Sequence, residues 1–158
     1  MTEQLLHGAV SAGDEVPPLE YEVSATTVVL GALASRDWRP MHHDYDFAVN
    51  RNGTKDIFLN TPNQAAWFER FVTDWTGPKA RLARMTFRMS DSVYPKDTMR
   101  FTGTVTGTDV DATGCGFVDI DVQLHADDRL CTTCAVRIAV PLDEADNPWA
   151  RRGEQWAP

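Results

Sequence analysis

The second half of the chain alternates between apolar and polar residues, a period typical of β-strands that bury one face. Four such runs follow one another, and turns such as residues 94–97 and 111–114 separate them. The pattern therefore predicts an antiparallel sheet whose four long strands cover residues 85–89, 99–105, 118–124 and 130–140.

Before these strands lies a segment whose large apolar residues recur at helical spacing. They are Trp67, Phe68, Phe71, Val72 and Trp75. We expect a helix that Thr61 caps, with Pro62 in the first helical position, Gln64 completing a capping box and Gly77 at the end. The apolar stripe is too broad for a surface helix, so this helix is predicted to be buried.

The first third of the chain predicts an extended segment over residues 16–19, a short strand over residues 20–23 and a helix from Ser24 to about Ser35. The apolar face of that helix includes Val29, Ala32 and Leu33. One buried helix followed by an antiparallel sheet predicts an α+β protein with a single hotdog fold, in which the sheet wraps around a long central helix.

The chain has 158 residues, of which 42% are hydrophobic and 24% are charged, as in one globular domain. We assign the hotdog domain to residues 1–142 and a polar C-terminal tail to residues 143–158. The tail carries Trp149 and Trp156. A free tail rarely needs two tryptophans, so we expect this one to dock on the domain or on a partner.

The formal net charge of −8 argues against nucleic acid as a partner. No apolar run approaches the ~20 residues of a membrane span, so no membrane association is expected. The first residues lack a basic region followed by a long apolar one, which argues against a secretory signal. These observations favour a cytoplasmic protein.

Cys131 and Cys134 form a C-x-x-C pair, the spacing of redox and zinc sites. They fall in the last predicted strand, where residues three apart point to opposite faces. A zinc site also needs further ligands. We therefore predict a structural role for both cysteines.

Candidate chemistry gathers in one short segment, residues 34–44. Asp37 and His42 lie five residues apart, with Pro40 between them. Pro40 removes a backbone donor and pushes Arg39 away from helical angles, so the chain should leave the helix and turn. Both side chains can then face one cleft, where an acid and an imidazole suit proton transfer to and from a bound water.

This segment resembles the signature of the MaoC-like, or (R)-specific, enoyl-CoA hydratases, which runs Ser-Gly-Asp-x-Asn-Pro-hydrophobic-His-x-Asp. The resemblance extends through the order of the elements, from about residue 13 to residue 141. It implies that Asp37 and His42 are catalytic. In that family the pair activates a water, which adds across the 2,3-double bond of an enoyl thioester or leaves in the reverse reaction. Asp44 also matches, and there we expect a turn-stabilising carboxylate.

Within the family, residues 34–37, 42–44, 55–58 and 72–78 resemble the catalytic subunits of bacterial steroid side-chain enoyl-CoA hydratases. This likeness implies an acyl-CoA substrate with a bulky, ring-bearing acyl group. The proposed proton-transfer chemistry requires no cofactor beyond that thioester. The likeness also implies a heteromer with a second MaoC-like subunit, with a homodimer as the alternative. Since a single hotdog layer leaves a sheet edge unpaired, a functional monomer is not expected.

The likeness has departures around the site. Arg36 stands where the family has a glycine, and Asn60-Thr61 stands where it commonly has His-Gly at the start of the buried helix. Thr61 keeps the backbone N–H that polarises the thioester carbonyl in the family, and a helix N-terminus favours the developing enolate. We therefore assign Asn60 and Thr61 to oxyanion and substrate binding. Arg51 and Lys55 are candidates for binding the CoA phosphates.

Three alternatives remain. A hotdog acyl-CoA thioesterase would use a carboxylate of the buried helix, Glu69 or Asp74, although both are better interpreted as solvated or salt-bridged. A non-catalytic acyl-CoA-binding subunit is disfavoured by the intact Asp37–His42 pair. A metal cluster at residues 42–46 is disfavoured because such sites need three or four convergent ligands, which adjacent histidines seldom supply.

Overall fold

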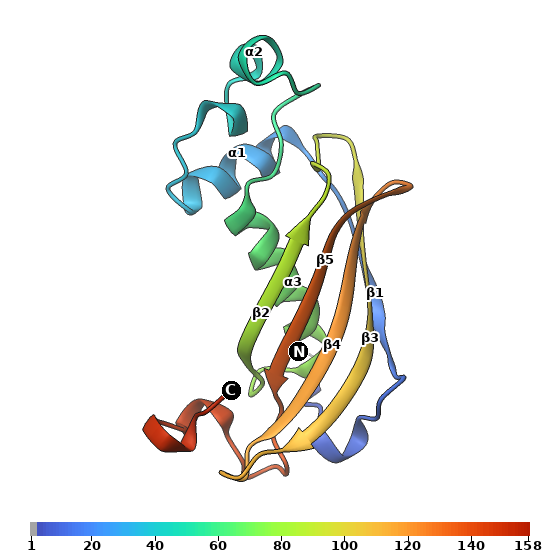
Figure 1. Cartoon of the computed structure of the whole chain (residues 1–158), viewed down its shortest axis with the longest axis vertical. Helices are drawn as coiled ribbons and strands as arrows, with labels where there is room; N and C mark the ends of the chain where they lie inside the picture. The colour runs from blue at the N-terminus through green and yellow to red at the C-terminus, as the bar shows by residue number, and fades with distance from the viewer. Residues whose placement is uncertain (1–2) are drawn as a thin grey trace.

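The computed structural model describes residues 3–158, which form a five-stranded antiparallel sheet with one long helix packed on it (Figure 1). The strands are β1 (Glu15–Glu22), β2 (Arg81–Met89), β3 (Thr98–Val110), β4 (Gly116–Ala126) and β5 (Arg129–Ala139). The sheet order is β1-β3-β4-β5-β2, so β1 and β2 are its edges. This is the predicted α+β layout.

The helices are α1 (Ala25–Ala34), α2 (Tyr45–Phe47) and α3 (Thr61–Thr76). Four short 3₁₀ turns are η1 (His7–Ala9), η2 (Pro40–His42), η4 (Pro148–Ala150) and η5 (Gly153–Gln155), and η3 (Ala48–Asn52) is a π-helical turn. Within residues 3–158, none of the helices combines the length and the apolar character needed to cross a membrane.

Helix α3 supplies the centre of the core. Phe68, Phe71 and Val72 are buried, as predicted, and Phe101 of β3 packs edge-on against Phe68 with ring centroids 5.2 Å apart. Gly103 lets β3 approach the helix closely, because a Cβ there would lie 3.0 Å from a ring carbon of Phe71. Burying each large apolar side chain contributes roughly 1.5–3 kcal/mol, so this stripe holds the helix to the sheet.

The start of α3 differs from the prediction by one residue. Asn60 is the N-cap rather than Thr61, because the Asn60 side chain accepts the Asn63 N–H at 3.1 Å. Gln64 forms no capping box. It is buried, and its Oε1 accepts the Thr132 hydroxyl at 2.8 Å. Asparagine and threonine are both suitable caps, so the sequence alone does not choose between them.

Helix α1 begins as predicted, since Ser24 forms a capping box with Thr27. Its buried residues are Val28 and Ala32, whereas Leu33, which was predicted on the apolar face, is exposed. The segment is apolar on nearly every side, so its periodicity does not select the buried face.

The leading extended segment and the short strand form one strand, β1. Its register with β3 shifts between Val16 and Leu19, and Pro17 and Pro18 occupy that shift. Proline cannot donate to a strand ladder, so an irregularity on an edge strand is where a sheet tolerates it.

A β-bulge changes the inward face at the start of β5. Thr132 pairs with Leu124 of β4, and Leu130 pairs with His125 of β4. Cys131 is therefore left unpaired in the ladder. Cys131 and Cys134 therefore both lie in the core, and Leu130 is exposed. The prediction that the two thiols point to opposite faces was wrong because a bulge shifts the alternation by one residue. Both cysteines are free, and burial raises the pKa of the Cys134 thiol to about 12.

The C-terminal tail docks on its own chain, at the end of the molecule opposite α2 (Figure 1). Trp149 Nε1 donates to the Ala80 carbonyl at 3.1 Å. The Arg81 guanidinium carbon lies 3.7 Å from the centroid of the Trp156 ring, and its Nη1 donates to the Pro148 carbonyl at 3.3 Å. Cation–π contacts and hydrogen bonds to main-chain carbonyls therefore hold the tail.

Candidate active site

The end of α1 places Asp37. The helix closes in a Schellman motif, in which the Arg36 N–H donates to Leu33 O at 3.0 Å and the Asp37 N–H donates to Ala32 O at 2.9 Å. Arg36 takes the left-handed conformation that this motif requires, with φ of 53°. Glycine adopts this conformation most readily, which accounts for the glycine at this point of the hydratase signature. Asp37 leaves the helix at a fixed position and is partly buried.

The turn that begins at Pro40 places His42. Arg39 is extended, as predicted for a residue before proline, and Pro40 opens η2. His42 is only 5% exposed, and its Nδ1 lies 2.8 Å from the Phe58 carbonyl oxygen. A carbonyl oxygen can only accept, so Nδ1 carries the hydrogen. In the neutral imidazole, Nε2 is then left with a free lone pair.

The two candidate catalytic groups face each other. His42 Nε2 lies 3.6 Å from Asp37 Oδ2, beyond a direct hydrogen bond and within reach of a single shared water. Asn60 Nδ2 donates to Asp37 Oδ2 at 3.0 Å and to Ser35 Oγ at 2.8 Å. The hydrogen bond from Asn60, with that from the Arg39 N–H, holds the pKa of Asp37 below its ordinary value despite partial burial. Asp37 is therefore a carboxylate at neutral pH.

The start of α3 leaves one backbone donor without a helical partner. Asn60 Oδ1 already accepts the Asn63 N–H, and Pro62 has no N–H. The Thr61 N–H has no acceptor within the helix, and the helix dipole favours a negative charge at this end. The Asn60 side chain, by contrast, is committed to the cap and to Asp37. Its amide group donates to Asp37 and Ser35, and the oxyanion contact expected of Asn60 stays a prediction.

These groups can move protons and hold negative charge in one place. An ionised carboxylate and an imidazole lone pair can bind one water and take a proton from it. The Thr61 N–H can stabilise an oxygen on which charge develops. Adding water to a polarised double bond requires both of these functions.

The two cations expected at the CoA phosphates have different surroundings. Arg51 is exposed on η3. Lys55 Nζ lies 3.6 Å from Asp97 Oδ1 and 4.4 Å from the centroid of the Tyr94 ring. Asp97 also binds Arg129 at 2.6 Å, so Lys55 belongs to a structural ion-pair network while its side chain stays largely exposed.

The residues of the alternative sites are solvated or structural. Glu69 and Asp74 are exposed on α3, where Asp74 lies 3.3 Å from Arg70. Asp44 caps α2 by accepting the Phe47 N–H at 3.0 Å, as predicted for a turn-stabilising carboxylate. Among residues 3–158, His, Cys, Asp and Glu side chains form no group of three or more that could hold a metal ion.

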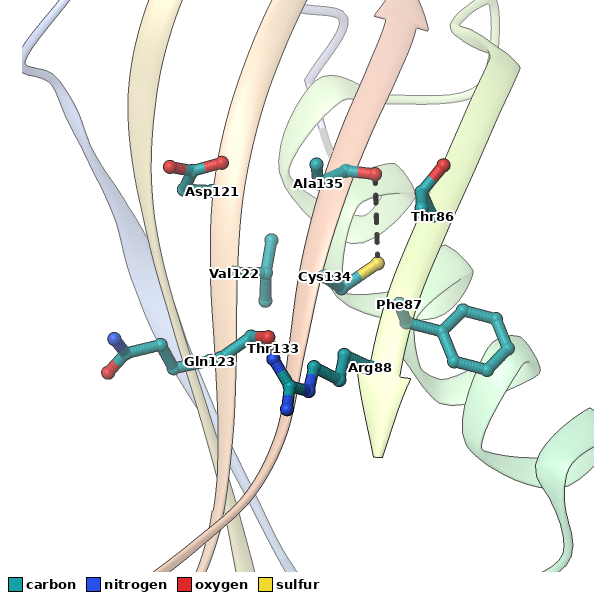
Figure 2. A pocket seen from close by; sticks show the side chains of 9 residues that line it. All are labelled: Thr86, Phe87, Arg88, Asp121, Val122, Gln123, Thr133, Cys134 and Ala135. Carbon is teal, nitrogen blue, oxygen red and sulfur yellow. Dashed lines mark hydrogen bonds between the residues drawn. The ribbon is translucent and has the colours of Figure 1, made fainter. Parts of the chain in front are cut away.

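A separate hollow of about 340 Å³ lies over β4, β5 and β2. Figure 2 shows Asp121, Ala135 and Thr86 beside it, and these three residues pair across the neighbouring strands. All three are exposed, so they lie on the face of the sheet away from the core. Neither Asp37 nor His42 lines this hollow, so the hollow is not part of the candidate active site.

No family model matches the chain. A curated relative, the 3-oxo-4,17-pregnadiene-20-carboxyl-CoA hydratase beta subunit of Mycobacterium tuberculosis (strain ATCC 25618 / H37Rv), is 40% identical over 94 residues, which cover 60% of this chain and 72% of the relative. In the crystal structure of the ChsH1–ChsH2 complex from Mycobacterium tuberculosis, a chain with 32% identity superimposes with a TM-score of 0.76, covering 82% of this chain and 98% of that one. The chain belongs to the MaoC-like hydratase family.

More distant structures share the fold of this MaoC-like chain. The (R)-hydratase from A. caviae involved in PHA biosynthesis superimposes with a TM-score of 0.74 at 17% identity, covering 84% of this chain and 98% of that one. The MaoC-like dehydratase from Rhodospirillum rubrum gives a TM-score of 0.74 at 15% identity, covering 86% and 96%. The predicted hotdog fold is thereby confirmed.

Sequence reasoning did not find two residues of this MaoC-like site. Phe58 holds His42 through its main-chain carbonyl, which any residue could supply, so its side chain gave no signal. Ser35 accepts a hydrogen bond from Asn60 and was considered only as a helix end. The available signal was Asn60 itself, a buried amide at a helix cap that needs partners for its donors.

Proposed function

We propose that this chain is the catalytic subunit of an enoyl-CoA hydratase that adds water to the 2,3-double bond of an enoyl-CoA with a bulky, steroid-type acyl group. The observation that carries the proposal is the Asp37–His42 pair, whose facing atoms lie 3.6 Å apart beside the start of α3. The name of the curated relative, a hydratase of a pregnadiene carboxyl-CoA, supports the substrate class. The reaction requires no cofactor beyond the thioester itself.

In the proposed reaction, one water lies between Asp37 Oδ2 and His42 Nε2. The Nε2 lone pair takes a proton while the water oxygen bonds to the β-carbon. The electron pair of the double bond moves toward the thioester oxygen, which the Thr61 N–H stabilises. A proton then returns from the Asp37–His42 pair to the α-carbon and the carbonyl re-forms. The water is consumed, and the two side chains regain their starting states.

We propose that the chain acts in a heteromer with a second MaoC-like subunit, or in a homodimer. The structure of its relative is a complex of ChsH1 with ChsH2. Strand β2 is an unpaired edge, and exposed edges invite pairing. The last residue of β2, Met89, has its sulfur 3.5 Å from Thr61 Oγ1, so a partner that pairs with this edge would lie beside the proposed oxyanion site.

A hydration assay tests this proposal. The full chain, alone and co-purified with the product of a neighbouring gene, is mixed with ring-bearing and four-carbon enoyl-CoAs, and loss of the conjugated thioester is followed. We expect hydration that persists after treatment with a metal chelator. A folded complex that binds enoyl-CoA without hydrating it would identify a non-catalytic acyl-CoA-binding subunit. Release of free CoA would identify a thioesterase.

A further inference from the structure

We propose that the edge of β2 selects its partner by charge. Its two free arginines disfavour pairing with a second copy of this chain and fit a subunit whose edge strand carries carboxylates. This inference rests on the proposed assembly and adds the chemistry of the partner's surface. Strand β2 holds three arginines and no acidic residue, although the formal net charge of the whole chain is −8.

The other edge of the sheet, β1, is poorly suited to pairing. Pro17 and Pro18 have no N–H to donate, and they occupy the place where the register of β1 with β3 shifts. Glu20 of β1 lies 3.5 Å from Arg100, so its charge already has a partner. Strand β2 contains no proline and is the opposite edge. A strand added to this sheet is therefore expected at β2.

The free arginines of β2 share the face of the sheet away from α3. Met85 and Phe87 pair with buried residues of β5 and pack against the core. Arg84, Thr86 and Arg88 alternate with them and are exposed, so all three point outward. A strand that pairs with β2 would bring its own outward side chains beside these three residues.

The charges of Arg84 and Arg88 are not neutralised within the described chain. Among residues 3–158, neither arginine takes part in an ion pair. Arg81, the first residue of the strand, instead donates to main-chain carbonyls of the C-terminal tail. A carboxylate placed across from Arg84 or Arg88 therefore gains an attractive pair, and a cation placed there is repelled.

A second copy of this chain would place arginine beside arginine. Antiparallel strands related by a two-fold axis set outward residues opposite outward residues. Centred on Thr86, the pairing sets Arg84 opposite Arg88 of the second copy. Centred on Arg84 or on Arg88, it sets that arginine opposite itself. Centred on Met85 or Phe87, it leaves one arginine diagonal to another at about 7–8 Å. Every register centred between residues 84 and 88 therefore contains a like-charge contact.

An acidic-edged copy of the chain is the probe for such a partner. In the full-length variant with both Arg84→Glu and Arg88→Glu, the same strand carries two carboxylates. At low salt, wild type and this variant should form a one-to-one dimer at least about 10-fold tighter than the self-association of either, measured by analytical ultracentrifugation. The control is Lys96→Glu, an equal charge change at an exposed turn residue. It should bind wild type no more tightly than wild type binds itself.

Salt and a neutral variant separate charge from shape. In about 1 M salt the screening length is about 3 Å, shorter than the spacing across strands, so the advantage of the mixed dimer should shrink to less than about twofold. The variant with Arg84→Gln and Arg88→Gln loses the repulsion without gaining carboxylates. It should self-associate about 2–10-fold more tightly than wild type. This result decides the question even if the Glu variant does not fold.

The proposal falls if wild type binds itself as tightly as it binds the acidic-edged copy, or if Lys96→Glu acts like the double Glu variant. It also falls if the Gln variant associates no better than wild type. Growth into open chains would indicate pairing of β2 with β1 of the next copy, and would overturn it too. None of these measurements involves enoyl-CoA, so failure of charge selection leaves the hydratase proposal standing, and an inactive chain leaves charge selection standing.

Discussion

The segment that holds Asp37 and His42, residues 35–60, and the C-terminal tail, residues 143–158, are both irregular, and they lie at opposite ends of the molecule (Figure 1). In the tail, Arg151 donates to Thr113 O at 3.2 Å and to Gly114 O at 2.8 Å, so its charge serves to fix the chain. In the turn, Asp37 and His42 face each other at 3.6 Å without bonding. Charged side chains that bond to main-chain carbonyls stabilise the folded chain. Charged and polar side chains that face each other without a direct bond can instead bind and act on a substrate.

Removing either facing group should produce the largest effect on activity. We expect Asp37→Asn and His42→Ala each to lower kcat by about 10²–10⁴-fold, because each removes a proton-transfer group. The matched control is His43→Ala, since His43 is the exposed neighbour. Steady-state hydration rates of the three folded variants measure these losses. An equal loss in His43→Ala would show that the wrong histidine was chosen.

Breaking the tail should instead cost stability. Arg81→Ala removes two hydrogen bonds to tail carbonyls and the contact with Trp156, and we expect the free energy of unfolding to fall by about 2 kcal/mol. Arg88→Ala, at an exposed position of the same strand, should change it by less than about 0.5 kcal/mol. Urea denaturation measures both. Identical values for the two variants would mean that the tail contacts contribute nothing.

Asn60→Ala should change the pKa of Asp37 while leaving its carboxyl group in place. The Asn60 hydrogen bond is the main cause of the lowered pKa of Asp37, so its loss should move that pKa upward. Titration of the Asp37 carboxyl carbon by NMR measures the shift. Ser35→Ala, which leaves the Asn60–Asp37 bond in place, should leave the pKa unchanged.

The same change has a consequence for stability with a defined sign. The folded-state pKa of Asp37 is lowered, so its contribution to the free energy of unfolding is present above the unfolded pKa of about 3.9 and is lost as pH falls through the folded value. In Asn60→Ala the folded pKa moves toward the unfolded value, so this contribution, and its loss on acidification, should be smaller. An unchanged acid limb of the stability curve would contradict this.

The smallest effect concerns the backbone beside Asp37. Arg36 has φ of 53°, which costs a residue with a side chain about 1 kcal/mol, so Arg36→Gly should raise the free energy of unfolding by up to that amount. Arg39 has φ of −68°, and Arg39→Gly should lower it by roughly 0.5–1 kcal/mol. Thermal denaturation of the two variants should therefore give shifts of opposite sign.

Much of the fold was predictable because alternation and helical spacing report burial directly. Phe68, Phe71 and Val72 fall in the core as predicted, and the four long strands appear. The errors are local. The bulge at Cys131 reverses two side chains through a ladder irregularity that composition does not reveal. The choice of Asn60 over Thr61 as cap depends on the path of the chain into the helix.

The part of the site that depends on side-chain identity and spacing was predictable from the sequence. Proline and the spacing of Asp37 and His42 indicate a shared turn, and the structure brings the two together. The tautomer of His42 was not predictable, because the carbonyl of Phe58 sets it and main-chain groups leave no mark on the sequence. The commitment of Asn60 to Asp37 likewise appears only when two distant segments meet.

We propose above all that Asp37 and His42 act as one unit on one water. The most direct test is the double variant Asp37→Asn with His42→Ala, compared with both single variants through kcat/KM for hydration of a ring-bearing enoyl-CoA. Groups that share one water should be strongly non-additive, so we predict that the double variant falls within about 10-fold of the worse single variant. Losses that multiply, to about 10⁴–10⁸-fold from two steps of 10²–10⁴, would show that the two residues act independently and would contradict this account.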